Sequence, residues 1–341
     1  MLNSWGVWEY KTKITRLQDF KITRLKDSKI IEYHHEPVLL KEVLQYLDPH
    51  PNENFVDATF GGGGYTKAVL ERIQPGGKVL ATDLDEDAIN NAKTQNLDIK
   101  NLILHHGNFK DIDKIVDHHK FENISGIVAD LGLSSYELDQ AGRGISFQKK
   151  EPLDMRFDQS QKETAAFILN NYDEKRLLNI FREFGEEKFS KQIARKIQET
   201  RDRRQETRYT TDLYQIIVDA LPKPVKHKAD DSARRIFQAL RIAVNHELDN
   251  LSEFLPKAFN ILNSGGRLVM VSFHSLEDRI VKQFFTSLAK GCVCPIDFPK
   301  CLCGKNPRGQ ILTKKPITAT QEELDINPRA KPAKLRVLLK I

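Results

Sequence analysis

Two acidic side chains flank a run of glycines near the start of the folded part of the sequence. An apolar run ends at Asp57, the four glycines 61–64 follow, and the helix-like TKAVLERI comes next. The strand-like KVLATDLD then brings Asp83 about 20 residues past the glycines. Such a strand, glycine loop and helix form nucleotide pockets in α/β proteins, because glycine lets a ligand approach the backbone and the helix start offers free N–H groups. We therefore expect Asp83 to accept hydrogen bonds from both hydroxyls of a ribose.

The glycine loop differs from the dinucleotide fingerprint G-x-G-x-x-G, because Tyr65, Thr66 and Lys67 follow the fourth glycine. A pyrophosphate is therefore not clearly accommodated, and the predicted ligand is adenosine-like with a ribose diol. S-adenosylmethionine fits this pattern better than NAD. The alternative interpretation is that the glycines form only a tight turn.

Two further side chains with useful chemistry follow predicted strands. Asp130 ends the strand-like GIVADL, where ligands bind in open α/β sheets, and could take an amine proton or bind the ammonium of a cofactor. His274 follows RLVMVSF and could orient a substrate base or act as an acid–base group. The alternatives are a turn-capping Asp and a structural His. We interpret Ser275, Glu277 and Asp278 as a helix cap with first-turn acids and assign them no chemistry.

These candidates require a sheet to position them. Strand-like and helix-like segments alternate as far as Asp130, which predicts a parallel, doubly wound sheet. A long segment with helical periodicity then interrupts the pattern, and strand-like runs return near the C-terminus. We therefore expect an α/β fold with an inserted all-helical domain. The expected parts are a basic N-terminal extension (1–35), a discontinuous core (36–137 and 244–341) and a helical insertion (138–243).

The basic residues are unevenly distributed. The net charge is +6, and residues 186–245 hold 14 Lys and Arg against 9 Asp and Glu, while residues 290–341 hold 11 against 4. This distribution indicates a polyanionic partner such as RNA, and the alternative is an ordinary solvated surface. In RRIFQALRIAVNHEL the polar side chains mostly share one helical face, which suits phosphate contacts as well as a plain solvated face. The candidate RNA-binding residues are Arg234, Arg235, Gln238 and Arg241.

Composition excludes some classes of protein. With 40% hydrophobic and 29% charged residues, the chain is typical of a soluble globular protein. No apolar run approaches the roughly 18 residues of a membrane span, and no secretory signal is visible, so we expect a cytoplasmic protein without membrane contact. The cysteines all lie between 292 and 303, as Cys292, Cys294, Cys301 and Cys303. They could form a closed zinc site or stay as free or redox-paired thiols, and we place no metal in the catalytic site.

Taken together, the motifs resemble one family, the bacterial 16S rRNA (cytosine-N(4)-)-methyltransferases. The matching stretches include HEPVLLKEVL, DATFGGGGYT, ATDLDEDAI, ADLGLSS, PLDMRFD, RRIFQALRIAVNHEL and GGRLVMVSFHSLEDRIVK, in this order over about residues 34–338. The resemblance implies a Rossmann-like class I methyltransferase sheet that uses S-adenosylmethionine. It also implies as substrate the 4-amino group of a cytosine near the decoding centre of small-subunit (16S) rRNA. The sequence leaves open whether the protein forms a homodimer.

The resemblance also assigns the cofactor pocket. By motif match, Gly63, Gly64 and Tyr65 would line the methionine end of the cofactor, Asp83 would bind its ribose and Phe109 would lie against its adenine. Tyr65 stands where the family commonly has His, which puts that side-chain contact in question.

Two further residues, Asp130 and Glu137, would complete the pocket, although Glu137 stands where the family commonly has Gln. The cytosine 4-amino group is a poor nucleophile because its lone pair is delocalised into the ring. An acceptor such as Asp130 would favour pyramidalisation and take the proton, and alignment of the reacting atoms supplies a proximity effect. An aromatic stacking partner is not evident beside Asp130, and Phe147 or Tyr136 could supply it.

Three other functions remain as alternatives. An NAD-linked oxidoreductase would need a dinucleotide fingerprint, which is absent. A methyltransferase for proteins or small molecules is disfavoured, weakly, by the basic insertion and tail. A non-catalytic RNA-binding or assembly factor is disfavoured because Asp83 and Asp130 are both present.

Overall fold

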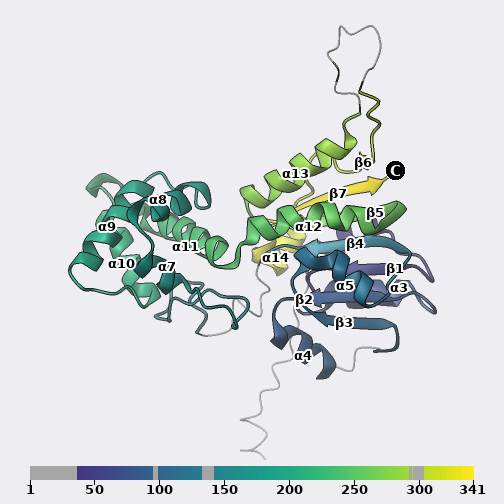
Figure 1. Ribbon diagram of the computed structural model, residues 1–341, viewed down its shortest axis with the longest axis horizontal. Helices are drawn as coiled ribbons and strands as arrows, with labels where there is room; N and C mark the ends of the chain where they lie inside the picture. The colour runs from purple at the N-terminus through teal and green to yellow at the C-terminus, as the bar shows by residue number, and fades with distance from the viewer. Residues whose placement is uncertain (1–36, 95–98, 133–141, 292–293, 295–302) are drawn as a thin grey trace, which may run out of the picture. The chain divides into compact units, whose positions relative to one another are not determined.

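The structure is a computed structural model, and it describes residues 37–94, 99–132, 142–291, 294 and 303–341 (Figure 1). The expected N-terminal extension lies outside the described residues. So do Tyr136 and Glu137, and Cys292 and Cys301 of the cysteine cluster. The two interpretations of that cluster therefore both stay open.

A seven-stranded sheet forms the centre of the fold, with strand order β3-β2-β1-β4-β5-β7-β6. The strands from β3 to β5 in this order are parallel, whereas β7 runs antiparallel to β5 and β6 antiparallel to β7. The predicted α/β fold with a doubly wound, Rossmann-like sheet is confirmed. The strands are β1 (Asn54–Asp57), β2 (Val79–Asp83), β3 (Leu102–His106), β4 (Ile124–Asp130), β5 (Leu262–Ser272), β6 (Gly309–Ile311) and β7 (Lys334–Lys340).

Helices cover both faces of this sheet, because alternate strand residues are apolar on either side. One hydrophobic cluster joins strand residues such as Phe55 and Val79 to α2 (Leu40–Leu47) and α3 (Gly64–Arg72). The other joins Val56 and Leu80 to the helices of the opposite face. These are α5 (Ile112–His118), α12 (Glu247–Ile261) and α13 (Ser275–Ala289), and Figure 1 shows α12 and α13 along the same side of the sheet. The remaining helices of this part are α4 (Glu86–Thr94) and α14 (Gln321–Ile326).

Between β4 and α12 the described chain is helical from residue 165 onward, as its periodicity predicts, whereas residues 142–164 form turns and irregular structure. It contains α7 (Ala165–Asn171), α8 (Glu174–Glu183), α9 (Ser190–Asp202), α10 (Thr210–Ala220) and α11 (Ala229–Asn245). A hydrophobic cluster of their own, running from Leu153 to Val244, holds these helices together. The division into a discontinuous core and an insertion stays a prediction. Among the described residues we find no helix long and apolar enough to cross a membrane.

Phe147 belongs to this helical cluster. Its ring stacks on Tyr214 with 5.4 Å between centroids, and it meets Phe237 edge to face with 5.6 Å between centroids. Tyr214 belongs to α10 and Phe237 to α11, so the Phe147 ring packs against these two helices. The other candidate for stacking on a base, Tyr136, lies outside the described residues.

Candidate active site

The glycine loop is anchored by a buried carboxylate at the end of β1. Asp57 is 1% exposed, and its oxygens accept hydrogen bonds from the Thr66 hydroxyl (2.7 Å) and the Thr59 backbone N–H (3.3 Å). Burial raises the pKa of Asp57 to about 7, despite the opposing effect of these hydrogen bonds. The Asp57 side chain therefore links Thr59, before the glycines, to Thr66 in the first turn of α3. Sequence reasoning noted Asp57 only as the residue before the glycines.

Two glycines of the loop are required by space and backbone geometry. Gly63 has φ +75°, and a Cβ there would lie 2.7 Å from the ring of Phe60. Gly64 begins α3, and a Cβ there would lie 2.1 Å from Cγ of Pro37. The loop therefore presents bare backbone beside the start of a helix, which is the arrangement expected for a nucleotide pocket.

Asp83 lies at the end of β2 and is hydrogen-bonded to the glycine loop. Its carboxylate accepts from the Gly61 N–H (2.7 Å) with one oxygen and from the Asp85 N–H (2.9 Å) with the other. A carboxylate oxygen has two lone pairs, so each oxygen retains one for a further donor, as a ribose diol requires. Burial raises the pKa of Asp83, and the Asp85 charge adds to this effect against the two hydrogen bonds.

Phe109 follows β3, in a short 3-10 helix, Phe109–Asp111, that the Asn108 side chain caps. Its ring meets the edge of Phe254 from α12, with 5.1 Å between centroids. This contact places an aromatic side chain at the carboxyl end of β3, two strands from the glycine loop in the sheet order. Its contact with an adenine stays a prediction.

Asp130 ends β4 and holds an unpartnered polar atom. Its Oδ1 is buried and has no hydrogen-bond partner among the described residues, while Oδ2 lies 3.5 Å from the Tyr65 hydroxyl. That hydroxyl already donates to the Val38 carbonyl. Burial, followed by the nearby carboxylates of Asp57 and Glu277, raises the pKa of Asp130 well above its usual range. A cationic group beside Asp130 would relieve this repulsion.

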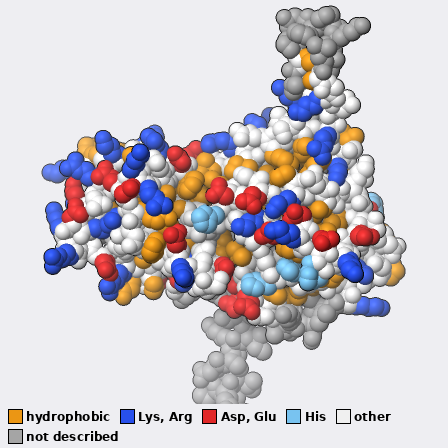
Figure 2. Space-filling view, in the orientation of Figure 1, with side chains coloured by type: hydrophobic (Ala, Val, Ile, Leu, Met, Phe, Trp, Pro, Cys, Tyr) orange, Lys and Arg blue, Asp and Glu red, His pale blue; other side chains and the backbone are white. Residues whose placement is uncertain are grey.

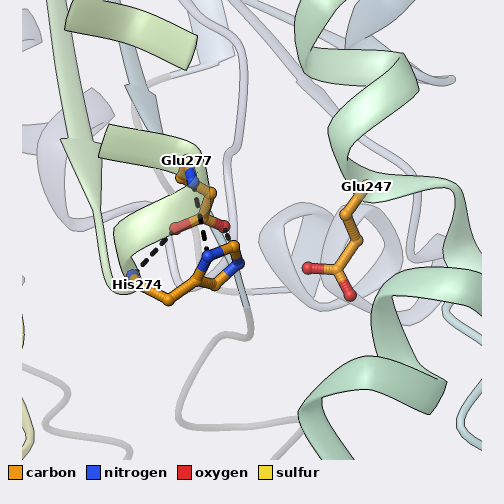
Figure 3. Close-up of side chains that lie close together, drawn as sticks. All are labelled: Glu247, His274 and Glu277. Carbon is orange, nitrogen blue, oxygen red and sulfur yellow. Dashed lines mark hydrogen bonds and ion pairs between the residues drawn. The ribbon is translucent and has the colours of Figure 1, made fainter. Parts of the chain in front are cut away.

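His274 lies where β5 gives way to α13, and it is the N-cap of that helix. Our assignment of the cap to Ser275 is therefore wrong. The His274 Nδ1 accepts the Glu277 N–H (3.3 Å), and the Glu277 carboxylate accepts the backbone N–H groups of Phe273 (2.8 Å) and His274 (3.2 Å). This reciprocal capping box fixes the imidazole at the carboxyl end of β5 (Figure 3). Asp278 instead forms an ion pair with Arg336 of β7 (2.6 Å).

Glu277 is 2% exposed. Burial alone would raise its pKa, but the contact with the His274 ring, the Arg241 charge and the Phe273 N–H hold the pKa below its usual range. The ionised carboxylate is therefore a fixed negative charge close to Asp130.

One group of His and acidic side chains, Glu247, His274 and Glu277, has donor atoms within 4.8 Å of one another (Figure 3). Two contacts make it a poor metal site. Both oxygens of Glu247 accept from the Arg241 guanidinium, at 2.8 and 2.9 Å. The His274 Nδ1 accepts a backbone N–H, so in the neutral ring Nε2 carries the hydrogen and has no lone pair for a metal.

The candidate RNA-binding side chains of α11 lie in different surroundings. Arg234 is exposed and pairs with Asp231 one turn away (3.1 Å). Arg235 instead pairs with the buried Glu187 (2.6 Å), and Gln238 donates to the Phe184 carbonyl (3.3 Å). Together with the Arg241–Glu247 pair, these contacts give most of the set a structural role, and RNA contact stays a prediction. In Figure 2 Lys and Arg side chains alternate with Asp and Glu over this helical part.

A buried ion pair that sequence reasoning missed joins the site to the segment after β4. Arg143 contacts Asp85 (3.2 Å), two residues beyond Asp83, and also donates to the carbonyls of Arg156 and Phe157. No local pattern could have indicated it, because the two partners lie 58 residues apart. The pair tethers the segment around Arg143 to the end of β2.

Comparison with known proteins gives one family. The model of the MraW methylase family matches residues 32–341. A protein of Heliobacterium mobile named "Ribosomal RNA small subunit methyltransferase H" is 46% identical over 313 residues, which cover 91% of this chain and 100% of the relative. A protein of Clostridium botulinum (strain Loch Maree / Type A3) with the same name is 45% identical, with the same coverage.

Solved structures show weaker similarity. A putative rRNA-methylase from Clostridium thermocellum is 12% identical and covers 89% of this chain and 95% of its own, with a TM-score of 0.41. A putative methyltransferase from Streptococcus mutans in complex with SAH is 14% identical and covers 90% and 100%, with a TM-score of 0.39.

Proposed function

The chain belongs to the MraW methylase family, and from this premise we propose that it transfers a methyl group from S-adenosylmethionine to the 4-amino group of a cytosine in small-subunit rRNA. The observation that carries the proposal is the position of Asp130. Its carboxylate, with one unpartnered buried oxygen, ends the strand next to the one that leads into the glycine loop. The names of the curated relatives support small-subunit rRNA as the substrate.

The residues of the site fit the cofactor. Asp83 has a lone pair left on each oxygen for the ribose hydroxyls, and Gly63 and Gly64 leave bare backbone where the methionine end would lie. Phe109 would lie against the adenine, and Tyr65 and Glu137 stay proposed contacts. When bound, S-adenosylmethionine supplies an electrophilic methyl group on a positively charged sulfur.

Asp130 would act on the amine. Burial and two neighbouring carboxylates favour its protonated form, and a positive charge beside it would favour the ionised form. In the cofactor-bound enzyme the ionised carboxylate would accept a hydrogen from the 4-amino group. That contact favours pyramidalisation of the nitrogen, which takes its lone pair out of conjugation with the ring, and gives the departing proton an acceptor. His274 would orient the base rather than exchange protons.

The target base has to be exposed, since a paired cytosine hides its 4-amino group. The exposed cations of the helical part, Arg234 among them, would contact the surrounding phosphates. We propose that the enzyme acts in the cytoplasm, where small subunits are assembled, on a cytosine near the decoding centre. A homodimer stays an untested option.

The direct test is methyl transfer in vitro. Purified protein with radiolabelled S-adenosylmethionine is expected to label small-subunit rRNA, either as naked RNA or within assembled subunits, and nuclease digestion should return the label as N(4)-methylcytidine. The Asp130→Asn variant should lose turnover by a larger factor than it loses RNA affinity. Label in another nucleoside, or in protein alone, would contradict the proposal.

A further inference from the structure

The capping role of His274 determines which hydrogen its ring can offer. Nδ1 accepts the Glu277 N–H, so the neutral ring carries its hydrogen on Nε2. Nε2 lies 3.1 Å from Oε1 of Glu277 but is not aligned for a hydrogen bond. The side chain is only 8% exposed, so this buried N–H has carboxylates nearby but makes no aligned hydrogen bond among the described residues. Such a group costs free energy unless a ligand satisfies it.

His274 follows the strand next to the one that Asp130 ends, on the side away from the ribose carboxylate. The sheet order is β2-β1-β4-β5, so Asp83 ends a strand on one side of β4 and His274 follows the strand on the other. The Leu131 N–H donates to the Val271 carbonyl (2.9 Å), which ties the ends of β4 and β5 together. Beyond them, a Cβ on Gly132 would contact the Phe273 ring at 3.7 Å. Two buried polar atoms that make no hydrogen bond among the described residues, an acceptor on Asp130 and a donor on His274, therefore belong to adjoining strand ends.

We propose that these two atoms read the edge of the target base, with the His274 Nε2–H donating to ring N3 of cytosine while Asp130 accepts from its 4-amino group. The inference rests on the proposed function. Cytosine presents an amine donor next to a ring acceptor, whereas uracil presents the opposite pair, so an acceptor beside a donor selects cytosine. Glu277 is a positioning residue, because its backbone N–H fixes the tautomer and its carboxylate fixes the cap.

This contact acts on binding rather than on the chemical step. A donor at N3 stabilises the form of cytosine in which the amine lone pair is shared with the ring, so it does not activate the amine. Removing the donor should therefore raise KM and leave kcat nearly unchanged. A general acid or base at His274 would instead lower kcat.

The test combines a variant with an altered base. His274→Asn keeps an N-cap side chain that accepts the Glu277 N–H, and its shorter amide NH2 ends one bond short of the position of the Nε2–H donor. The altered substrate is the RNA with 3-deazacytidine at the target position, which replaces the acceptor N3 with C–H. The matched control is His246→Asn, because His246 precedes α12 with an exposed side chain and φ +52°, a conformation that Asn tolerates.

For the wild-type protein, replacing N3 of the target cytosine with C–H should lower RNA affinity and raise KM, each roughly tenfold, which is the value of one hydrogen bond. His274→Asn should show a similar loss with normal RNA and no additional loss with 3-deazacytidine, and His246→Asn should behave as wild type. RNA binding is measured in the presence of S-adenosylhomocysteine, so that affinity is read without turnover. Thermal unfolding checks that each variant is folded.

If 3-deazacytidine lowered the RNA affinity of His274→Asn by a further factor of about ten, the inference would be overturned. It would also be overturned by a divalent cation that binds wild type stoichiometrically in a Zn²⁺ titration and is lost in His274→Asn, since Nε2 would then be a metal ligand. Failure of wild type to methylate any RNA would count against the proposed function instead, so the two failures are distinguishable.

Discussion

Replacing Asp57 with Asn should change how the stability of the protein depends on pH. Burial raises the pKa of this carboxyl from 3.8 to about 7 in the folded protein. The folded state therefore holds a proton that the unfolded state releases between these two pH values. The contribution of the protonated Asp57 to the free energy of unfolding is fully present below about pH 4, and it is lost as the pH rises through about 7.

The size of the effect follows from the shift. About three pKa units, at about 1.4 kcal/mol each, correspond to about 4 kcal/mol in total. Of this, about 3 kcal/mol should appear between pH 5 and pH 8. Asn cannot ionise, so the free energy of unfolding of Asp57→Asn minus that of wild type should rise by this amount across the range. Any rearranged hydrogen bond to Thr66 adds a constant that does not depend on pH.

Urea unfolding followed by circular dichroism, in steps from pH 5 to pH 8, measures this difference. Asp117→Asn serves as the control, because Asp117 lies exposed on α5. A difference between Asp57→Asn and wild type that stays flat with pH would refute the argument, since the buried carboxyl would then not titrate in this range.

Three further changes test the site and its support. Asp83→Asn should weaken cofactor affinity at least tenfold in isothermal titration, because hydrogen bonds to a charged acceptor are worth about 1.5–3 kcal/mol; an unchanged affinity would contradict its role. Gly64→Ala should cost about 1–3 kcal/mol in unfolding free energy, through the 2.1 Å approach to Pro37, and Pro37→Ala should restore most of it. Glu247→Gln should cost about 3 kcal/mol in unfolding free energy by breaking a mostly buried ion pair with Arg241, and Arg241→Met together with Glu247→Met should cost less because it removes both charges.

The sheet could be predicted from the sequence because its strands carry continuous apolar runs and its loops carry glycine and acidic residues. The same patterns placed Asp83 and Asp130 at strand ends, as the structure has them. Strand β6 was not predicted, since three residues, Gly309–Ile311, are too few for a periodic signal and pair only with the antiparallel edge of the sheet.

The parts of the site that were not predicted depend on partners far apart in the chain. Arg143 contacts Asp85, and Arg235 contacts Glu187, across 58 and 48 residues. A helical wheel shows that Arg235 lies on a polar face but cannot show that this face packs against another carboxylate. The cap of α13 was assigned to Ser275 because Ser is the commoner cap residue, and only the backbone geometry identifies His274.

Mass spectrometry of digested small-subunit rRNA, from cells with and without this protein, is the most direct test of the proposed methyl transfer. Loss of one N(4)-methylcytidine on deletion, restored by wild type but not by Asp83→Ala, is the predicted result, and it would establish the reaction, the substrate and the cofactor pocket together. An unchanged methylcytidine profile would contradict the assignment to rRNA.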